Sequence, residues 1–332
     1  MTSEPMVTLR LLMLSAVTLA PLLAQEPDTQ PTIKVEVDVV SVLASVRNKQ
    51  GGLVGNLDKD AFVLSEDAKP QTIKYFTRET DLPLTIGLLV DVSRSQERLI
   101  DIEKDAASQF FSQVLRAKDM AFLISFGEEC ELLQDYTGSA RLLRAGLSGL
   151  KVNAPVGTLS RMPGPVPTVY QPRGTVLYDA VFLAADEKLK GQVGRKVLVL
   201  ITDGVDMGSR LKISDALRAA QKSDAIIYSI DYEDPSAYGG RFGFGIGGGM
   251  GESELRKMSE QTGGRVFKVS RKHTLSEAFA EIQAEMRSQY AIGYTPTNAV
   301  RDGGFRHIDL KTTDKDLRVQ ARKGYFASKP EE

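Results

Sequence analysis

The sequence is poor in the residues that form disulfides and zinc sites. It contains a single cysteine, Cys130, so no disulfide can form within the chain. Its two histidines, His273 and His307, stand far apart and have no cysteine or histidine partner at metal-ligand spacing. A zinc site is therefore not expected.

An excess of charge of either sign is also missing. The chain has 42 basic and 43 acidic side chains, which gives a formal net charge of −1. Binding to nucleic acid or to an anionic membrane surface is therefore not indicated. The length of 332 residues, with 42% hydrophobic and 26% charged residues, is ordinary for a soluble globular protein. It leaves room for one large domain and a smaller one.

Long apolar runs are scarce as well, and the one of note lies at the N-terminus. Arg10 precedes residues 11–23, which are mostly apolar but too few to span a bilayer comfortably, and Ala24 offers a small residue for cleavage. We interpret residues 1–24 as a signal peptide for export to the periplasm or beyond the cell, and residues 25–31 as a linker. After cleavage no membrane span is expected. The alternative is an uncleaved N-terminal segment that anchors the protein.

Common catalytic and nucleotide-binding motifs are absent. The chain has no G-x-S-x-G, H-E-x-x-H or G-x-x-x-x-G-K-[ST] sequence. Within residues 239–251 the pattern G-x-G-x-x-G is formally met by Gly243, Gly245 and Gly248. These glycines do not open a tight strand-to-helix turn, so we expect a flexible loop and no nucleotide. A haloacid-dehalogenase-type phosphotransferase would need an aspartate two residues after Asp91, where this chain has Ser93.

Three oxygen-bearing side chains follow the first strand of an alternating strand and helix pattern. Residues 85–90, TIGLLV, form a near-continuous apolar run, typical of a strand buried on both faces of a parallel sheet. Asp91, Ser93 and Ser95 come next, beyond the carboxyl end of the strand, where open α/β sheets place their ligands. Such hard oxygen donors suit Mg²⁺, Mn²⁺ or Ca²⁺ rather than zinc.

Two later segments supply donors of the same kind. Thr175 begins a helical pattern over residues 175–190, and a buried-strand pattern over residues 195–202 is followed by Asp203. A stretch with several prolines, residues 153–173, leads into Thr175, and we expect it to shape the binding face. The alternative is that the two serines only cap a helix over residues 97–115 and that Asp203 only starts a turn.

Together these segments resemble the metal-ion-dependent adhesion site (MIDAS) of von Willebrand factor A domains, also found in integrin I domains. The match comprises Asp91, Ser93, Ser95, Thr175 and Asp203. The resemblance implies a doubly wound, Rossmann-like α/β domain with a largely parallel sheet over residues 82–290. It also implies that hydroxyl oxygens and two carboxylates hold Mg²⁺, or else Mn²⁺ or Ca²⁺. An acidic side chain of a protein partner would then complete the metal shell.

The segments on both sides of this domain have β-strand patterns. Residues 32–80 and 291–328 contain short apolar runs separated by turn signals, and residues 329–332 form a tail. Each segment alone has few strands, so we expect the two to form one small β domain. Residues 37–76, 262–264, 294–298 and 322–326 also look like parts of secreted bacterial VWFA-related proteins of acidobacterial type, which implies export. The last helical pattern before the second segment covers residues 275–290.

We therefore predict an exported, adhesion-type module that binds a protein partner through a divalent metal and has no catalytic activity. A structural or assembly protein whose metal only stabilises the fold is the alternative, and a metal-dependent hydrolase is a further one. We interpret Asp179 as a polar helix residue or an outer support of the site, and Asp206 as part of a loop. Arg94 and Arg173 are interpreted as surface arginines near the metal.

Overall fold

The computed structural model describes residues 39–79, 82–152, 174–232 and 248–327. Several predicted segments lie outside these residues: the signal peptide, the linker, the stretch 153–173 with Arg173, and the tail. Most of the glycine-rich stretch 239–251 also lies outside them. Among the residues described, none of the helices is long and apolar enough to cross a membrane.

A six-stranded sheet forms the centre of the α/β domain, in the order β10-β9-β8-β5-β6-β7. The strands are β5 (Leu84–Asp91), β6 (Met120–Phe126), β7 (Cys130–Thr137), β8 (Arg195–Thr202), β9 (Ala225–Asp231) and β10 (Val266–Lys268). Neighbouring strands are parallel, except that β7 runs antiparallel to β6. All residues of β5 are buried, as the apolar run predicted.

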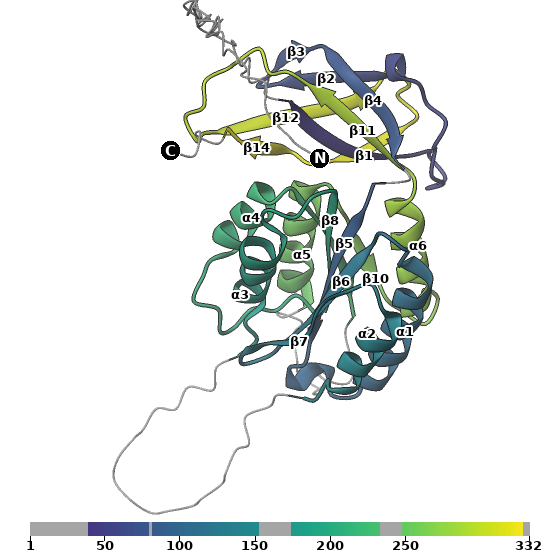
Figure 1. Ribbon diagram of the computed structural model, residues 1–332, viewed down its shortest axis with the longest axis vertical. Helices are drawn as coiled ribbons and strands as arrows, with labels where there is room; N and C mark the ends of the chain where they lie inside the picture. The colour runs from purple at the N-terminus through teal and green to yellow at the C-terminus, as the bar shows by residue number, and fades with distance from the viewer. Residues whose placement is uncertain (1–38, 80–81, 153–173, 233–247, 328–332) are drawn as a thin grey trace, which may run out of the picture. The chain divides into compact units, whose positions relative to one another are not determined.

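Helices cover both faces of this sheet (Figure 1). One face carries α1 (Ile100–Val114), α2 (Ala140–Ser148) and α6 (Leu275–Met286). The other carries α3 (Leu177–Phe182), its π-helical continuation η3 (Leu183–Leu189), α4 (Ile213–Lys222) and α5 (Gly248–Thr262). Alternate residues of β5 serve the two cores, because Leu88 belongs to the first and Leu89 to the second. The predicted doubly wound α/β class is therefore confirmed.

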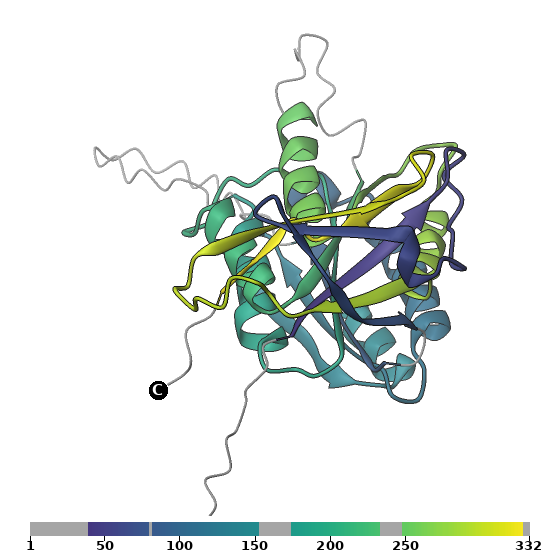
Figure 2. The same cartoon turned by 90° about the horizontal axis from the view of Figure 1, so that it is seen from above.

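Strands from both flanks of the chain form two antiparallel sheets of four strands each. The first has the order β13-β1-β11-β4, from Arg318–Ala321, Val40–Arg47, Gln289–Tyr294 and Ile73–Glu79. The second has the order β14-β12-β2-β3, and these strands cover Gly324–Phe326, Phe305–Thr312, Phe62–Glu66 and Lys69–Gln71. The short 3-10 helix η1 (Lys59–Ala61) precedes β2. The early strand β1 pairs with the late strands β11 and β13 (Figure 2). This is the pairing of flanks that the predicted fold class describes, and the domain boundaries stay predictions.

The end of the last helix differs from its sequence pattern. Residues 275–290 predicted one helix, but α6 ends at Met286 and Gln289 already belongs to β11. The reason lies in the β domain, where the Tyr290 ring packs against Phe62 and Phe76 at centroid distances of 5.1 and 5.8 Å. Burial of this ring outweighs the local helical pattern.

Three other helices also differ at their starts. The first turn of α5 includes residues 248–251, which the sequence predicted to be loop. The pattern of residues 175–190 becomes α3 and the π-helical η3, starting at Leu177. The predicted helix over 97–115 begins only at Ile100, after the 3-10 turn η2 (Arg94–Gln96). This late start leaves Ser93 and Ser95 outside α1.

Candidate metal centre

Asp91 is the last residue of β5, and its carboxylate is held at both oxygens. Oδ1 accepts the N–H of Ser93 at 2.9 Å, and Oδ2 accepts the hydroxyl of Thr202 at 2.6 Å. The Thr202 hydroxyl in turn accepts the N–H of Gly204 at 3.1 Å. Asp91 and Thr202 are fully buried. Sequence reasoning missed Thr202, although a hydroxyl directly before Asp203, at the end of the neighbouring strand, was the available signal.

Ser95 connects the loop after β5 to the loop after β8. Its hydroxyl donates to Oδ2 of Asp203 at 2.8 Å and lies 3.0 Å from the hydroxyl of Ser93. Strands β5 and β8 are parallel neighbours, so their carboxyl ends meet at the same edge of the sheet. The structure thus brings together four of the five predicted ligands: Asp91, Ser93, Ser95 and Asp203.

The capping alternative for the two serines is wrong. Ser93 occupies the N-cap position of η2, but its side chain makes no capping hydrogen bond, and α1 is preceded by Leu99. Instead, the two serine hydroxyls lie within hydrogen-bond distance of each other, and the Ser95 hydroxyl donates to Asp203. The turn role of Asp203 is real, since its Oδ1 accepts the N–H of Val205 at 3.0 Å. One oxygen of Asp203 therefore shapes the turn while the other contacts Ser95.

Thr175 lies at the same edge, held by its backbone. Its carbonyl accepts the N–H groups of Met207 at 3.0 Å and Gly208 at 3.1 Å, in the loop that follows Asp203. The next residue, Val176, donates its N–H to Gly127 after β6 at 2.9 Å. Within the described part of the chain, no hydrogen bond links the Thr175 hydroxyl to the other four predicted ligands. The structure thus fixes the position of Thr175 beside them without a direct side-chain bond.

Asp179 and Asp206 build the loop that carries Asp203. The Ser209 hydroxyl accepts the N–H groups of Tyr178 at 3.0 Å and Asp179 at 3.2 Å, in the first turn of α3. The Asp179 carboxylate in return accepts the N–H groups of Arg210 and Leu211. Asp206 accepts the hydroxyl of Ser209. Both aspartates therefore act as supports of the site, and Arg94 is an exposed surface residue.

A close backbone approach explains the glycine after Asp203. Gly204 has a φ of +79°, and a Cβ there would lie 2.5 Å from the carbonyl oxygen of Gly251 in α5. A Cβ on Gly251 would lie 2.2 Å from the carbonyl oxygen of Asp203. The first turn of α5 therefore lies directly against this loop, and neither position has room for a side chain.

The site concentrates negative charge in a buried place. Burial and the charge of Asp203 raise the pKa of Asp91 to about 7 against the opposing hydrogen bonds. Burial and the charge of Asp91 raise the pKa of Glu103 on α1 well above its usual range. Among the described residues, neither carboxyl oxygen of Glu103 has a hydrogen-bond partner. Sequence reasoning missed Glu103, which lies four residues after Leu99 on the apolar side of the helical pattern.

This donor set fits a hard divalent cation. The described residues contain no group of three or more His, Cys, Asp or Glu side chains that could hold a metal. The site instead offers two carboxylates, of Asp91 and Asp203, beside hydroxyl groups, the oxygen ligands that Mg²⁺ and Ca²⁺ prefer. A cation between the two carboxylates would also offset the repulsion that raises the pKa of Asp91.

No protein-family model matches the chain, and no curated protein is similar to it in sequence. Solved structures are similar. A serine-substituted form of an aerotolerance-related membrane protein from Bacteroides fragilis has 16% identity and a TM-score of 0.44, over 61% of this chain and 98% of the other. The SpRpn10 VWA domain has 15% identity and a TM-score of 0.39, and the match covers 60% of this chain and 95% of that domain. Proximal thread matrix protein 1 from the mussel byssus, with a zinc-occupied MIDAS motif, has 12% identity and a TM-score of 0.42, and the match covers 64% of this chain and 49% of that protein.

The sheet order, the helices on both faces and the place of the predicted ligands at the ends of β5 and β8 agree with the von Willebrand factor A fold that the sequence predicted. The resemblance of the flanks to acidobacterial secreted proteins stays a prediction.

Proposed function

We propose that the protein is an exported module that binds a protein partner through a divalent cation, with Asp91, Ser93, Ser95, Thr175 and Asp203 as the cation ligands. The observation that carries the proposal is the hydrogen bond between Ser95 and Asp203, which joins the two loops that bear the predicted ligands. Export rests on the sequence of residues 1–24.

The chain's own groups would hold the ligands in place. Thr202 and the N–H of Ser93 orient Asp91, and the N–H of Val205 orients Asp203. Two carboxylates against one divalent ion leave little excess negative charge, and the remaining donors are neutral hydroxyls. A cation held by these residues would supply a Lewis-acidic centre that an acidic side chain of the partner could bind. Mg²⁺ is the proposed ion, with Mn²⁺ or Ca²⁺ as alternatives.

The proposal includes no catalysis. General acid or base chemistry near neutral pH most often uses histidine. Here His273 contacts Glu281 of α6 at 2.9 Å, and His307 belongs to β12 in the β domain. Neither histidine belongs to the loops after β5 and β8 that carry the predicted ligands. Recognition without bond making is the role that we propose for the site.

The first experiment tests metal binding. Thermal unfolding is measured in EDTA and then with millimolar Mg²⁺, Mn²⁺ or Ca²⁺, for the parent, Asp91→Ala and the control Asp101→Ala, whose side chain is 96% exposed. We expect the midpoint to rise with metal in the parent and the control but not in Asp91→Ala. A metal concentration 100 times the dissociation constant should stabilise the fold by about 2.7 kcal/mol. No rise with any ion would refute the metal centre.

The second experiment tests partner recognition. An array of peptides, each with one central Glu or Asp, is paired with the same peptides carrying Gln or Asn. We expect binding to acidic members only, in Mg²⁺ but not in EDTA, and lost in Asp91→Ala. Stabilisation by metal without any metal-dependent peptide binding would instead support a structural or assembly role.

A further inference from the structure

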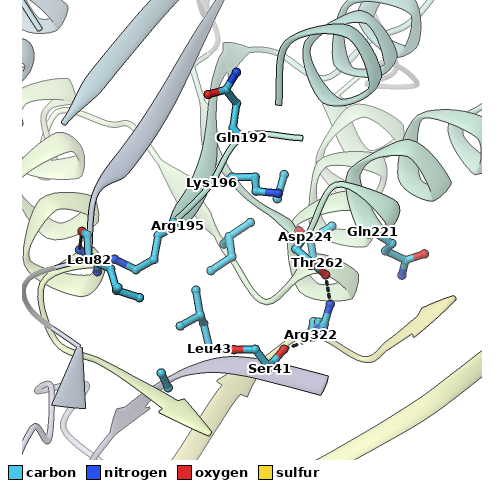
Figure 3. Close-up of a pocket in the computed structure, with 14 residues that line it drawn as sticks. Ser41, Leu43, Leu82, Gln192, Arg195, Lys196, Gln221, Asp224, Thr262 and Arg322 are labelled. Atoms are coloured by element: carbon cyan, nitrogen blue, oxygen red, sulfur yellow. Dashed lines mark hydrogen bonds and ion pairs between the residues drawn. The ribbon is translucent and has the colours of Figure 1, made fainter. Parts of the chain in front are cut away.

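A cavity of about 310 Å³ lies at the opposite edge of the α/β sheet from the metal centre, where β8 and β9 begin. In Figure 3, Ser41 and Leu43 from β1 line it on one side, and Arg195 and Lys196 from β8 on the other. Its volume is in the range of sites for small molecules. The cavity shares no residue with the predicted metal ligands.

The walls of this cavity are largely apolar. Aliphatic side chains enter it from four elements or their flanks: Leu43, Leu82, Ala225, Ile226 and Ala291. Such walls favour a ligand with a hydrocarbon or aromatic body, because burial of apolar surface stabilises the complex. They offer little to a small, fully hydrated ion.

Basic side chains outnumber acidic ones among the described residues that line the cavity. Arg322 forms an ion pair with Asp224 and donates to the carbonyl of Ser41 at 2.6 Å. Arg195 is 2% exposed and donates to the backbone carbonyls of Met286 and Leu82. With Lys196, the described residues that line the cavity include three basic side chains and one carboxylate.

Lys196 is the cation best placed for a ligand. Its side chain is half-buried, and within the described residues its ammonium group makes no hydrogen bond or ion pair. Burial lowers the pKa of Lys196, against the charge of Asp224, which already pairs with Arg322. An anion in the cavity would pair with this ammonium group, which has no ion pair with any described residue.

We propose that the cavity binds a small monoanionic molecule with an apolar body, of the aliphatic carboxylate class, whose anionic group pairs with Lys196. The apolar body lies against Leu43 and Ile226. This site does not depend on the metal centre or on its partner.

The test uses octanoate as the probe and octanamide as its uncharged match, by titration calorimetry with the whole protein in EDTA. Octanoate should bind more tightly than octanamide. Lys196→Met should weaken octanoate binding by about tenfold or more, because it removes a charge-assisted hydrogen bond. Ala291→Leu should weaken both probes by filling the cavity. Lys74→Met removes an exposed lysine on β4 and should change neither.

Three results would overturn the proposal. They are no octanoate binding by the parent at millimolar concentration, equal affinity in Lys196→Met, and loss of binding in Asp91→Ala, which would place the carboxylate at the metal centre. Each variant is checked by circular dichroism and thermal unfolding. If Lys196→Met does not fold, Lys196→Gln takes its place with the same expected loss.

Discussion

The hydroxyl of Thr202 offers the sharpest test of how the metal centre is held. Thr202→Val keeps the shape of the side chain and removes its one oxygen. The change deletes the 2.6 Å hydrogen bond to Asp91 and leaves the N–H of Gly204 without its acceptor. Thr202→Ser is the matched control, because it keeps the hydroxyl and loses only a methyl group.

The expected loss of folding stability follows from these two hydrogen bonds. A hydrogen bond to a charged acceptor contributes about 1.5–3 kcal/mol, and a buried donor without a partner costs about 1–3 kcal/mol. The methyl group that replaces the hydroxyl in valine stabilises the fold by about 0.8 kcal/mol. We expect Thr202→Val to lower the free energy of unfolding by about 2–4 kcal/mol, a large share of the stability of a typical domain. Loss of such an outer support should also weaken metal binding by about 10–100-fold.

The two effects are measured separately. Urea unfolding in EDTA gives the stability change, and calorimetric titration with Mg²⁺ at a temperature where all variants are folded gives the affinity. Thr202→Ser should bind Mg²⁺ nearly as tightly as the parent. If Thr202→Val bound Mg²⁺ as tightly as Thr202→Ser, the hydroxyl would not orient Asp91, and this account of the site would be refuted.

Three further substitutions test the fold around the site. Glu285→Gln should lower the free energy of unfolding by about 3 kcal/mol in urea, because Glu285 is fully buried and pairs with Arg47 and Arg265; an unchanged midpoint would contradict this. Gly204→Ala should lower the free energy of unfolding by more than about 1 kcal/mol and weaken Mg²⁺ binding, because the φ of Gly204 is +79° and a Cβ there has no room. Phe110→Ala should lower the free energy of unfolding, measured in urea, by about 3–5 kcal/mol, because this buried ring packs in the core. It should leave the Mg²⁺ affinity unchanged.

Much of the candidate metal centre was predictable because its signals are local. A buried strand shows itself as an apolar run, and residues 85–90 and 195–202 are both of this kind. Parallel neighbours place their carboxyl ends at one edge, so Asp91 and Asp203 were expected close together. The structure joins them through Ser95. Strand identity and chain order were enough for this part.

The remaining features depend on contacts between distant parts of the chain. Tyr290 fits a helix pattern, yet it joins a strand because Phe62 and Phe76 lie against its ring. The first turn of α5 lies against Gly204, and nothing within a glycine-rich sequence signals such a partner. Glu103 resembles any polar helix residue until its burial beside Asp91 is known. The sequence close to each of these residues does not indicate which distant residues contact it.

The two proposed sites lie at opposite ends of β8 and should act independently. Lys196 is near the start of the strand and Thr202 at its end, six residues apart, which at about 3.3 Å per residue is roughly 20 Å. Perturbations at that separation with no shared partners are usually additive within about 0.5 kcal/mol. The octanoate affinity in saturating Mg²⁺ should therefore match that in EDTA within about twofold. A larger shift would mean that β8 or the helices around it have two arrangements, each favoured by one ligand.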